Sequence, residues 1–293
     1  LTDDQGVATS PPYLAGPLPG HLSVYAYVAP GVSPFFFTDA EATAALRVID
    51  FVQVTPEPIA VRDGLWVVAS EASGKPGRGF HLEVQNQVMA AVVFAYEADG
   101  RSNFHLATAP SANNSGVASL ERYRDGTSFG ATWRPAVSAG SAGSVAIAFS
   151  GPERGTIQLP GEPIRDIQKL VWSGDASPAG SPGTGLWAIS DELDGSPGRG
   201  FQIEVQGELL VLTVFAYDAT GENVFYQSSG RLQDGVFTGE LNQYRGGRFL
   251  GGPQQNAVLS GSAGTVTIRF SSAQTGEIQF PGEAAKSIRK LSW

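Results

Sequence analysis

The strongest constraint on the fold is an internal repeat. Residues 64–172 and 185–293 align at a constant offset of 121 positions, without insertion or deletion, and share 45 identities in 109 positions. Turns rich in glycine and proline have kept their lengths as strictly as the apolar segments, which strand register requires. The chain therefore contains one fold used twice.

Each repeat is predicted to be all-β. The 293 residues include 37 glycines and 19 prolines and are only 16% charged, which is typical of turn-rich β proteins. In residues 79–85 the apolar side chains Phe80, Leu82 and Val84 alternate with polar ones, so this strand is expected to have one dry and one wet face. The run that ends at Tyr96 is apolar on both faces and is expected to be covered on both sides.

The strands are expected to follow one another as antiparallel neighbours. About eight short strands joined in sequence predict an up-and-down barrel or a sandwich, and we favour the barrel because closure removes exposed strand edges. In the first repeat, further strands are expected from Phe104 onward and at residues 118–124, 128–133, 145–149, 156–159 and 167–172.

The region before the first repeat, residues 22–63, is predicted to be a partial β unit. Phe51 lies 13 residues before the first repeat, just as Trp172 lies 13 residues before the second. Strands without a sheet need partners, because each buried unpaired backbone group costs on the order of 1–3 kcal/mol. They could add to the first repeat, add to a neighbouring molecule as in β-augmentation, or belong to repeats whose boundaries are shifted by a strand or two. The side chains expected to enter a neighbouring molecule are Val24, Ala26 and Val28.

The remaining segments are expected to be connectors. Residues 1–21 are predicted to be extended. Residues 173–184, punctuated by proline and glycine, are predicted to be a linker that separates the two repeats without fixing their angle.

Charge and composition exclude several classes of function. With 28 acidic and 19 basic residues the net charge is -9, which disfavours nucleic acid as a partner. The absence of cysteine excludes disulfides and thiolate chemistry. No stretch has the roughly 18 apolar residues that a membrane span needs. The start at Leu1 instead of methionine is consistent with a removed signal peptide, so we expect an extracellular or cell-surface protein.

Catalysis has little support in the pattern of histidines. None of the three histidines has a histidine at the equivalent position of the other repeat, so neither a triad nor a histidine metal cluster recurs. We therefore expect no enzyme activity and no cofactor.

Polar residues common to both repeats are the first candidates for a ligand site. The repeat keeps arginine, glutamate and tyrosine at positions that could meet at one end of the sheet and grip a polar ligand such as a sugar. The alternative is that the charged members form surface or rim ion pairs. The candidate residues are Arg78, Glu83, Tyr96, Tyr123 and Arg124.

The tryptophans divide into two groups. Four of the five are shared by the repeats and are predicted to be core residues, because a buried tryptophan removes about 150–250 Å² from water: Trp66, Trp172, Trp187 and Trp293. The fifth, Trp133, has Gln254 opposite it in the second repeat. It is thus the tryptophan free to be exposed, and is a candidate platform for sugar stacking.

One acidic loop is a candidate for a metal site. Asp191, Glu192 and Asp194 lie close together ahead of a glycine and could hold Ca²⁺, although the first repeat lacks this set and the spacing of an EF-hand is absent. The competing interpretation is a solvated acidic loop.

Two resemblances arise from these motifs. The pattern GxGF, a strand, a short turn and [FW]xY[DE]xxG, at residues 77–104 and 198–225, resembles a tandem β-repeat domain of uncharacterised secreted and cell-surface bacterial proteins. This resemblance implies an extracellular, non-catalytic β module. Gly64-x-Trp66 with a basic residue, Lys169, near the end of the repeat is similar to the lipocalin and avidin-type barrels, which adds to the preference for a barrel.

Together these observations predict a secreted bacterial structural or adhesive protein of the cell surface. We expect self-association, with the chain as a filament subunit joined by strand addition through its N-terminal strands. The alternative is a carbohydrate-binding, lectin-like module with glycans as partners.

Overall fold

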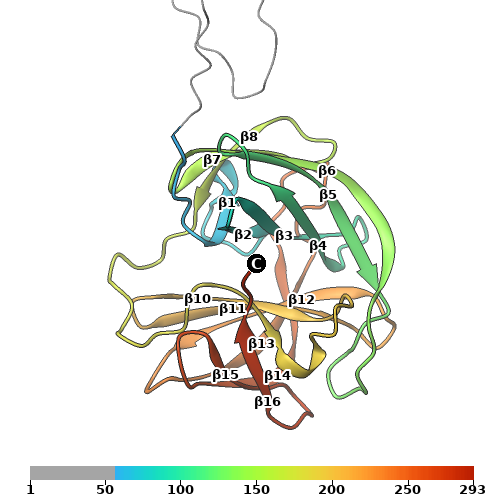
Figure 1. Ribbon diagram of the computed structural model, residues 1–293. Helices are drawn as coiled ribbons and strands as arrows, with labels where there is room; N and C mark the ends of the chain where they lie inside the picture. Colours follow the sequence, from blue (N-terminus) through green and yellow to red (C-terminus); the bar gives the residue numbers. More distant parts are fainter. Residues whose placement is uncertain (1–56) are drawn as a thin grey trace, which may run out of the picture. The chain divides into compact units, whose positions relative to one another are not determined.

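The computed structural model describes residues 57–293, which form two closed eight-stranded β-barrels (Figure 1). The predicted all-β tandem fold is thereby confirmed, with barrels and not sandwiches. Barrel 1 consists of β1 (Gly64–Val68), β2 (Gly79–Gln85), β3 (Val88–Tyr96), β4 (Ser102–Pro110), β5 (Ser115–Arg124), β6 (Val137–Gly151), β7 (Arg154–Gln158) and β8 (Arg165–Lys169). Barrel 2 consists of β9 (Gly185–Ile189), β10 (Gly200–Gln206), β11 (Leu209–Tyr217), β12 (Asn223–Arg231), β13 (Val236–Arg245), β14 (Val258–Phe270), β15 (Thr275–Gln279) and β16 (Lys286–Lys290).

Each barrel is an antiparallel meander that closes on itself. Neighbouring strands are consecutive in sequence, and the first strand pairs with the last, as Trp66 with Lys169 in barrel 1. A short 3-10 turn follows the first strand of each barrel, η1 (Ala69–Glu71) and η2 (Ser190–Glu192). The tight β2–β3 turn uses Asn86 and Gln87 at φ of 47° and 61°, the left-handed region that such a two-residue hairpin requires.

The strand predicted at residues 128–133 is wrong. This segment belongs to the loop between β5 and β6, and Gly130 turns the chain with a φ of 75°. The aromatic residue that suggested a strand, Phe129, does not alternate along barrel 1 but packs against the apolar core of barrel 2. The predicted N-terminal unit at residues 22–63 lies almost entirely outside the described residues, and its last part, residues 57–63, contains no strand.

The barrel interiors are filled by side chains. Trp66 and Phe80 in barrel 1 are 0% and 1% exposed, and their equivalents Trp187 and Phe201 occupy barrel 2 in the same way. These two tryptophans therefore confirm the core prediction. Trp172 and Trp293 instead lie half-buried against a third apolar cluster, between the barrels.

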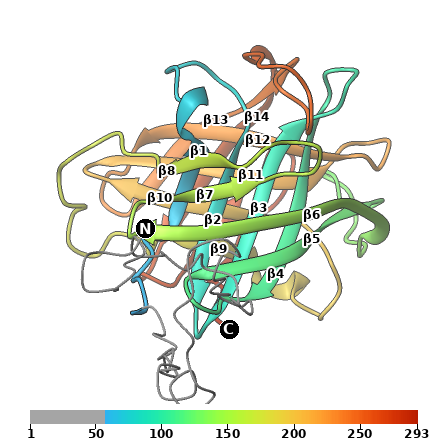
Figure 2. The same ribbon diagram turned by 90° about the horizontal axis from the view of Figure 1, so that it is seen from above.

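This third cluster joins the two barrels. It is formed mainly by outward-facing side chains of β1, β3 and β4 in barrel 1 and of β9, β11 and β12 in barrel 2. The rings of Phe94 and Phe225 are 5.2 Å apart, centroid to centroid. The equivalent pair, Phe104 and Phe215, is separated by 5.3 Å. Figure 2 shows strands of barrel 1 crossing those of barrel 2 behind them. The run before Tyr96 is covered on both sides, as predicted, with barrel 2 as its second cover. The linker at residues 173–184 was expected to leave the angle between the repeats open, and this shared apolar interface holds the two barrels together.

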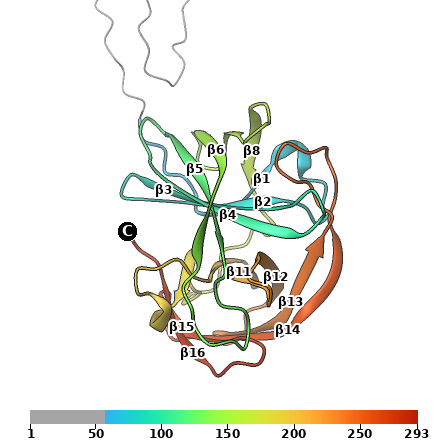
Figure 3. The same cartoon turned by 90° about the vertical axis from the view of Figure 1, so that its right-hand side faces the viewer.

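The barrels also exchange loops. The 125–136 loop of barrel 1 runs onto barrel 2, and the equivalent 246–257 loop of barrel 2 runs back beside η1 (Figure 3). Phe129 packs against the core of barrel 2, and its equivalent Leu250 packs against the core of barrel 1. A loop of each repeat thus covers the barrel of the other repeat. The arrangement is that of a pseudo-twofold dimer whose two halves belong to one chain.

Candidate functional site

Glu83, a predicted site residue, lies at the centre of the inter-barrel interface. Its side chain is 0% exposed, so the expectation that it lies on a wet strand face is wrong. Its carboxylate accepts hydrogen bonds from Lys290 Nζ at 2.7 Å and from the backbone N–H of Leu186 at 2.9 Å, both in barrel 2. Burial alone would raise the pKa of Glu83, but hydrogen bonds from His81, Lys290 and Leu186 outweigh it and lower the pKa to about 2.

The symmetric contact is made by Glu204 of barrel 2. Its carboxylate binds Lys169 and accepts a hydrogen bond from the backbone N–H of Leu65 at 2.7 Å, both in barrel 1. The two glutamates therefore tie the first strand of each barrel to the other barrel. In an isolated repeat each glutamate would face solvent, and in the packed pair it is buried.

Arg78 lies in a second buried ionic cluster. Its side chain is 2% exposed, and its guanidinium binds Glu71 at 2.7 Å and Glu162 at 2.5 Å. Arg248, from the 246–257 loop of barrel 2, binds the same two carboxylates. Burial alone would lower the pKa of Arg78, but both carboxylates raise it above its ordinary value. The interpretation of Arg78 as a rim ion pair is wrong, because the loop from the other barrel covers it.

The remaining members of the predicted cluster occupy three different environments. Tyr96 is 2% exposed, its ring lies against Gly247 of barrel 2, and its hydroxyl has no hydrogen-bond partner. Tyr123 is half-buried beside the inter-barrel cluster. Arg124 is exposed, with Asp125 at 3.6 Å. The structure thus does not gather the five predicted residues around one ligand, since Arg78, Glu83 and Tyr96 face the other barrel.

Trp133 is not an exposed platform. It is half-buried, and its ring lies over Gly198 of barrel 2. The carboxylate of Asp194 accepts a hydrogen bond from the backbone N–H of Ser196 at 2.8 Å, and this bond, together with the nearby Trp133, lowers the pKa of Asp194. Trp133 therefore fastens the 125–136 loop to barrel 2.

The acidic loop does not form a calcium site. Glu192 is bound by Arg199 at 2.7 Å and by Lys286 at 2.9 Å, and Asp194 faces Trp133. Asp191 is exposed. Within residues 57–293, no three histidine or acidic side chains are grouped closely enough to hold a metal ion, so the Ca²⁺ alternative is wrong for this loop.

The space that Trp133 fills is open at the equivalent position of the other repeat. There the tryptophan is replaced by Gln254, and a cavity of about 300 Å³ lies beside the 71–79 loop. A Cβ atom added to Gly198 would lie 2.5 Å from the Trp133 ring, whereas one added to the equivalent Gly77 would have no atom within 4 Å. We call this space the inter-barrel cavity, and its residues include Gly77, Phe94, Gln227, Gln254, Gln255 and Asn256.

The difference between Trp133 and Gln254 is visible in the sequence, where it predicted an exposed binding platform at Trp133. The open space lies instead at Gln254. The signal that could have found the cavity is the run of three amide residues at 254–256, where the first repeat has tryptophan, arginine and proline. Recognising it requires knowing that this loop crosses to the other barrel, which local sequence patterns do not contain.

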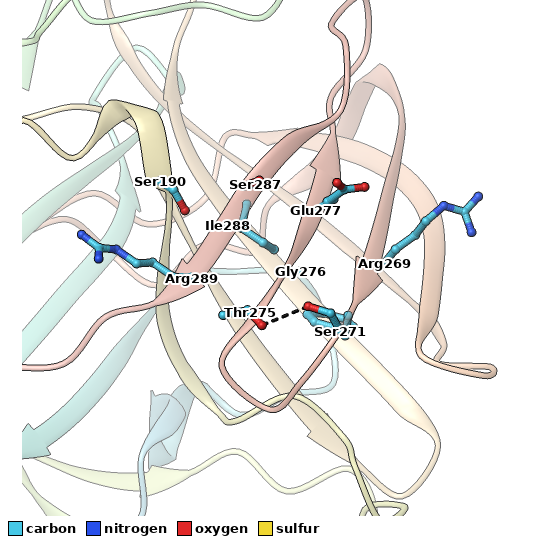
Figure 4. A pocket seen from close by; sticks show the side chains of 10 residues that line it. Ser190, Arg269, Ser271, Thr275, Gly276, Glu277, Ser287, Ile288 and Arg289 are labelled. Atoms are coloured by element: carbon cyan, nitrogen blue, oxygen red, sulfur yellow. Dashed lines mark hydrogen bonds between the residues drawn. The ribbon is translucent and has the colours of Figure 1, made fainter.

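A second depression lies on the outer surface of barrel 2. It has a volume of about 470 Å³ and is bordered by Arg269 and Arg289 (Figure 4). The two guanidinium groups extend to opposite sides of it, so they do not converge on one anion. Its floor is formed by the β15–β16 hairpin near Gly276 and Ile288. The inter-barrel cavity, which four amide side chains line, is therefore the better candidate.

The chain matches no protein family model, no curated protein and no solved structure. Helices of the length and apolarity needed to cross a bilayer are absent from residues 57–293. The site must therefore be interpreted from its own geometry.

Proposed function

We propose that the chain is a non-catalytic adhesive protein of the extracellular surface, and that the inter-barrel cavity is its binding site. The observation that carries the proposal is the broken symmetry at Trp133 and Gln254. The surrounding framework is retained in both repeats, including the proline–glycine–arginine–glycine loop, yet only one of the two spaces is open. A concave space with convergent polar groups is the usual form of a ligand site.

The use of the charged residues supports a binding role over a catalytic one. Arg78 and Glu83 are the most buried charged candidates, and both are bound by other groups of the protein. Arg78 binds Glu71 and Glu162 in its ionic cluster, and Glu83 binds Leu186 and Lys290 of the other barrel. A general acid, base or nucleophile has to reach a substrate, whereas these groups hold the two barrels together. The cavity is lined mainly by amides and apolar groups, which favour binding.

The test is to close the cavity with the residue that closes its counterpart. In Gln254→Trp the indole should occupy the space beside Gly77 as Trp133 does beside Gly198. We expect the full chain to bind a panel of immobilised polysaccharides and collagen in pull-down and surface plasmon resonance assays, and the variant to lose that binding at unchanged melting temperature.

The matched control is Trp133→Gln, which opens the equivalent space in the other half of the molecule. It should lower the melting temperature but leave binding at the original cavity unchanged. Unchanged binding by Gln254→Trp would contradict the proposed site.

Self-assembly is a second candidate function. It is favoured by the pair of neighbouring strands in each barrel that shares the fewest paired positions. Strands β4 and β5 share one paired position, Leu106 with Glu121, and β12 and β13 share Gln227 with Asn242. Such a junction is where an added strand would meet the fewest existing hydrogen bonds. The expected strand-addition residues, Val24, Ala26 and Val28, lie outside the described residues. Deletion of residues 1–53 should abolish assembly measured by light scattering while the fold remains, and persisting assembly would contradict this candidate.

A further inference from the structure

We infer that the ligand of the inter-barrel cavity is a neutral sugar ring. The inference rests on the proposed function and names the chemical class that this site would take. Three features of the cavity carry it: its shape, its amides and its charge balance.

The shape of the cavity follows from its filled counterpart. On the other side of the molecule the equivalent space holds the Trp133 ring, a flat group, over Gly198. The framework beside Gly77 has the same sequence of proline, glycine, arginine and glycine. The open cavity is therefore built to receive a ring of modest thickness with one face against the glycine loop.

The polarity of the lining distinguishes the open cavity from the filled one. Where the first repeat contributes Leu106 and Trp133, the second contributes Gln227 and Gln254, and Gln255 and Asn256 also line the cavity. An amide side chain has both donors and an acceptor. The oxygen of Gln254 already accepts from Arg248 at 3.3 Å and that of Asn256 from Ser73 at 3.5 Å, so these two offer mainly their N–H donors to a ligand. Sugar hydroxyls likewise donate and accept, so amides around a ring match a pyranose better than they match an indole. The apolar part of the lining, which includes Phe94, suits the C–H face of a sugar.

The buried charges in the lining of the cavity are already balanced. Glu71 and Arg78 line it, but they bind each other at 2.7 Å and belong to the cluster completed by Glu162 and Arg248. Lys75 is at the exposed rim, where water and salt screen its charge. A ligand inside the cavity thus meets no uncompensated buried charge, which favours a neutral sugar over an acidic one.

The experiment is a glycan array carrying neutral and acidic glycans, probed with the full chain and four variants. Gln254→Trp should lose binding by filling the cavity. The double variant Gln255→Ala with Asn256→Ala should weaken it about tenfold or more, because it removes two hydrogen-bonding side chains from the lining. Gln158→Ala, an exposed amide on β7 of barrel 1, is the matched control and should bind like the wild type. A thermal melt of each variant shows that the fold is intact.

The outcomes separate the two proposals. Neutral glycans bound by the wild type, with the expected losses, support the inference. Binding only to acidic glycans, lost in Lys75→Ala, overturns it, as does binding only to collagen or to a tryptophan-containing peptide. In those cases sensitivity to Gln254→Trp keeps the proposed function. If Gln254→Trp changes the binding of no probe, both proposals fail.

Discussion

The carboxylate of Glu83 in barrel 1 accepts a hydrogen bond from the backbone N–H of Leu186 in barrel 2, and Glu204 makes the same contact with Leu65 in the opposite direction. Both glutamates also bind a lysine of the other barrel. The polar connections between the barrels are thus reciprocal, and each glutamate takes its counter-charge and a backbone donor from the other barrel. The two repeats are best regarded as one folding unit.

Replacing Glu83 by glutamine should destabilise the whole unit. The change leaves the half-buried ammonium of Lys290, whose side chain is 18% exposed, without its counter-charge. Breaking one partner of a fully buried ion pair costs about 3–5 kcal/mol, so we expect a loss of about 3 kcal/mol or less here. Chemical denaturation should show a lower midpoint with one transition for both barrels. The matched control is Glu208→Gln at the exposed pair with Arg231, which should change the free energy of unfolding by less than about 0.5 kcal/mol. Equal effects of the two substitutions would contradict the assigned role of Glu83.

A glycine at the interface should also be intolerant of a single methyl group. A Cβ on Gly247 would run into the ring of Tyr96 of barrel 1, in a place without room for adjustment. Gly247→Ala should therefore cost about 1–3 kcal/mol by overpacking. Gly261→Ala, where a Cβ meets no atom within 4 Å, should be near neutral in the same thermal-melt assay. A stable Gly247→Ala variant would mean that the two barrels do not pack this closely.

Acid should destabilise the protein through His105. Burial, together with the positive charge of Arg122, lowers the pKa of His105 from 6.5 to about 4. Unfolding frees the imidazole to take up a proton, so its contribution to stability is present above pH 6.5 and is lost as the pH falls toward 4. Between pH 7 and pH 5 the wild type should lose about 2 kcal/mol more than His105→Gln.

Urea denaturation of both proteins at several pH values measures this difference. Glu83 has a lowered pKa as well, but its contribution is lost below pH 4.5, so it adds little between pH 7 and pH 5. Parallel stability profiles for the wild type and the variant would show that His105 is not held neutral in the folded state.

The barrel itself was predictable because its signals are local. The alternation of residues 79–85, the two-sided apolar run before Tyr96 and the glycine-bearing turns depend on near neighbours in sequence, and the ungapped repeat doubled each signal. The position of Glu83 was mispredicted for the opposite reason. Alternation correctly assigns it to the outer face of barrel 1, but which outer face is covered depends on the second barrel, more than 100 residues away.

The candidate site escaped prediction for the same physical reason. Trp133 and Gln254 were visible as a substitution between repeats, yet an isolated repeat would leave either side chain in solvent. Only the crossing of both loops to the opposite barrel turns the tryptophan into a fastener and the glutamine into the border of a cavity.

Loop exchange predicts that a substitution in one repeat loosens the other. Phe129 belongs to the first repeat, but its ring is 5.2 Å from Tyr226 and 4.9 Å from Phe280 of barrel 2. Phe129→Ala should cost about 2 kcal/mol, less than a fully buried phenylalanine because the ring is half-buried. Hydrogen–deuterium exchange should rise in β12 and next to Phe280, while the strands of barrel 1 keep their protection.

The reciprocal substitution completes this test. Leu250→Ala, at the equivalent position of the second repeat, should raise exchange in barrel 1, because Leu250 packs against the core of that barrel. If instead each substitution loosened the barrel of its own repeat, the loops would have to cap their own barrels in solution. Since the inter-barrel cavity is bordered by the 246–257 loop, that outcome would also remove the cavity. The exchange pattern therefore tests the geometry on which the binding proposal depends, independently of any ligand.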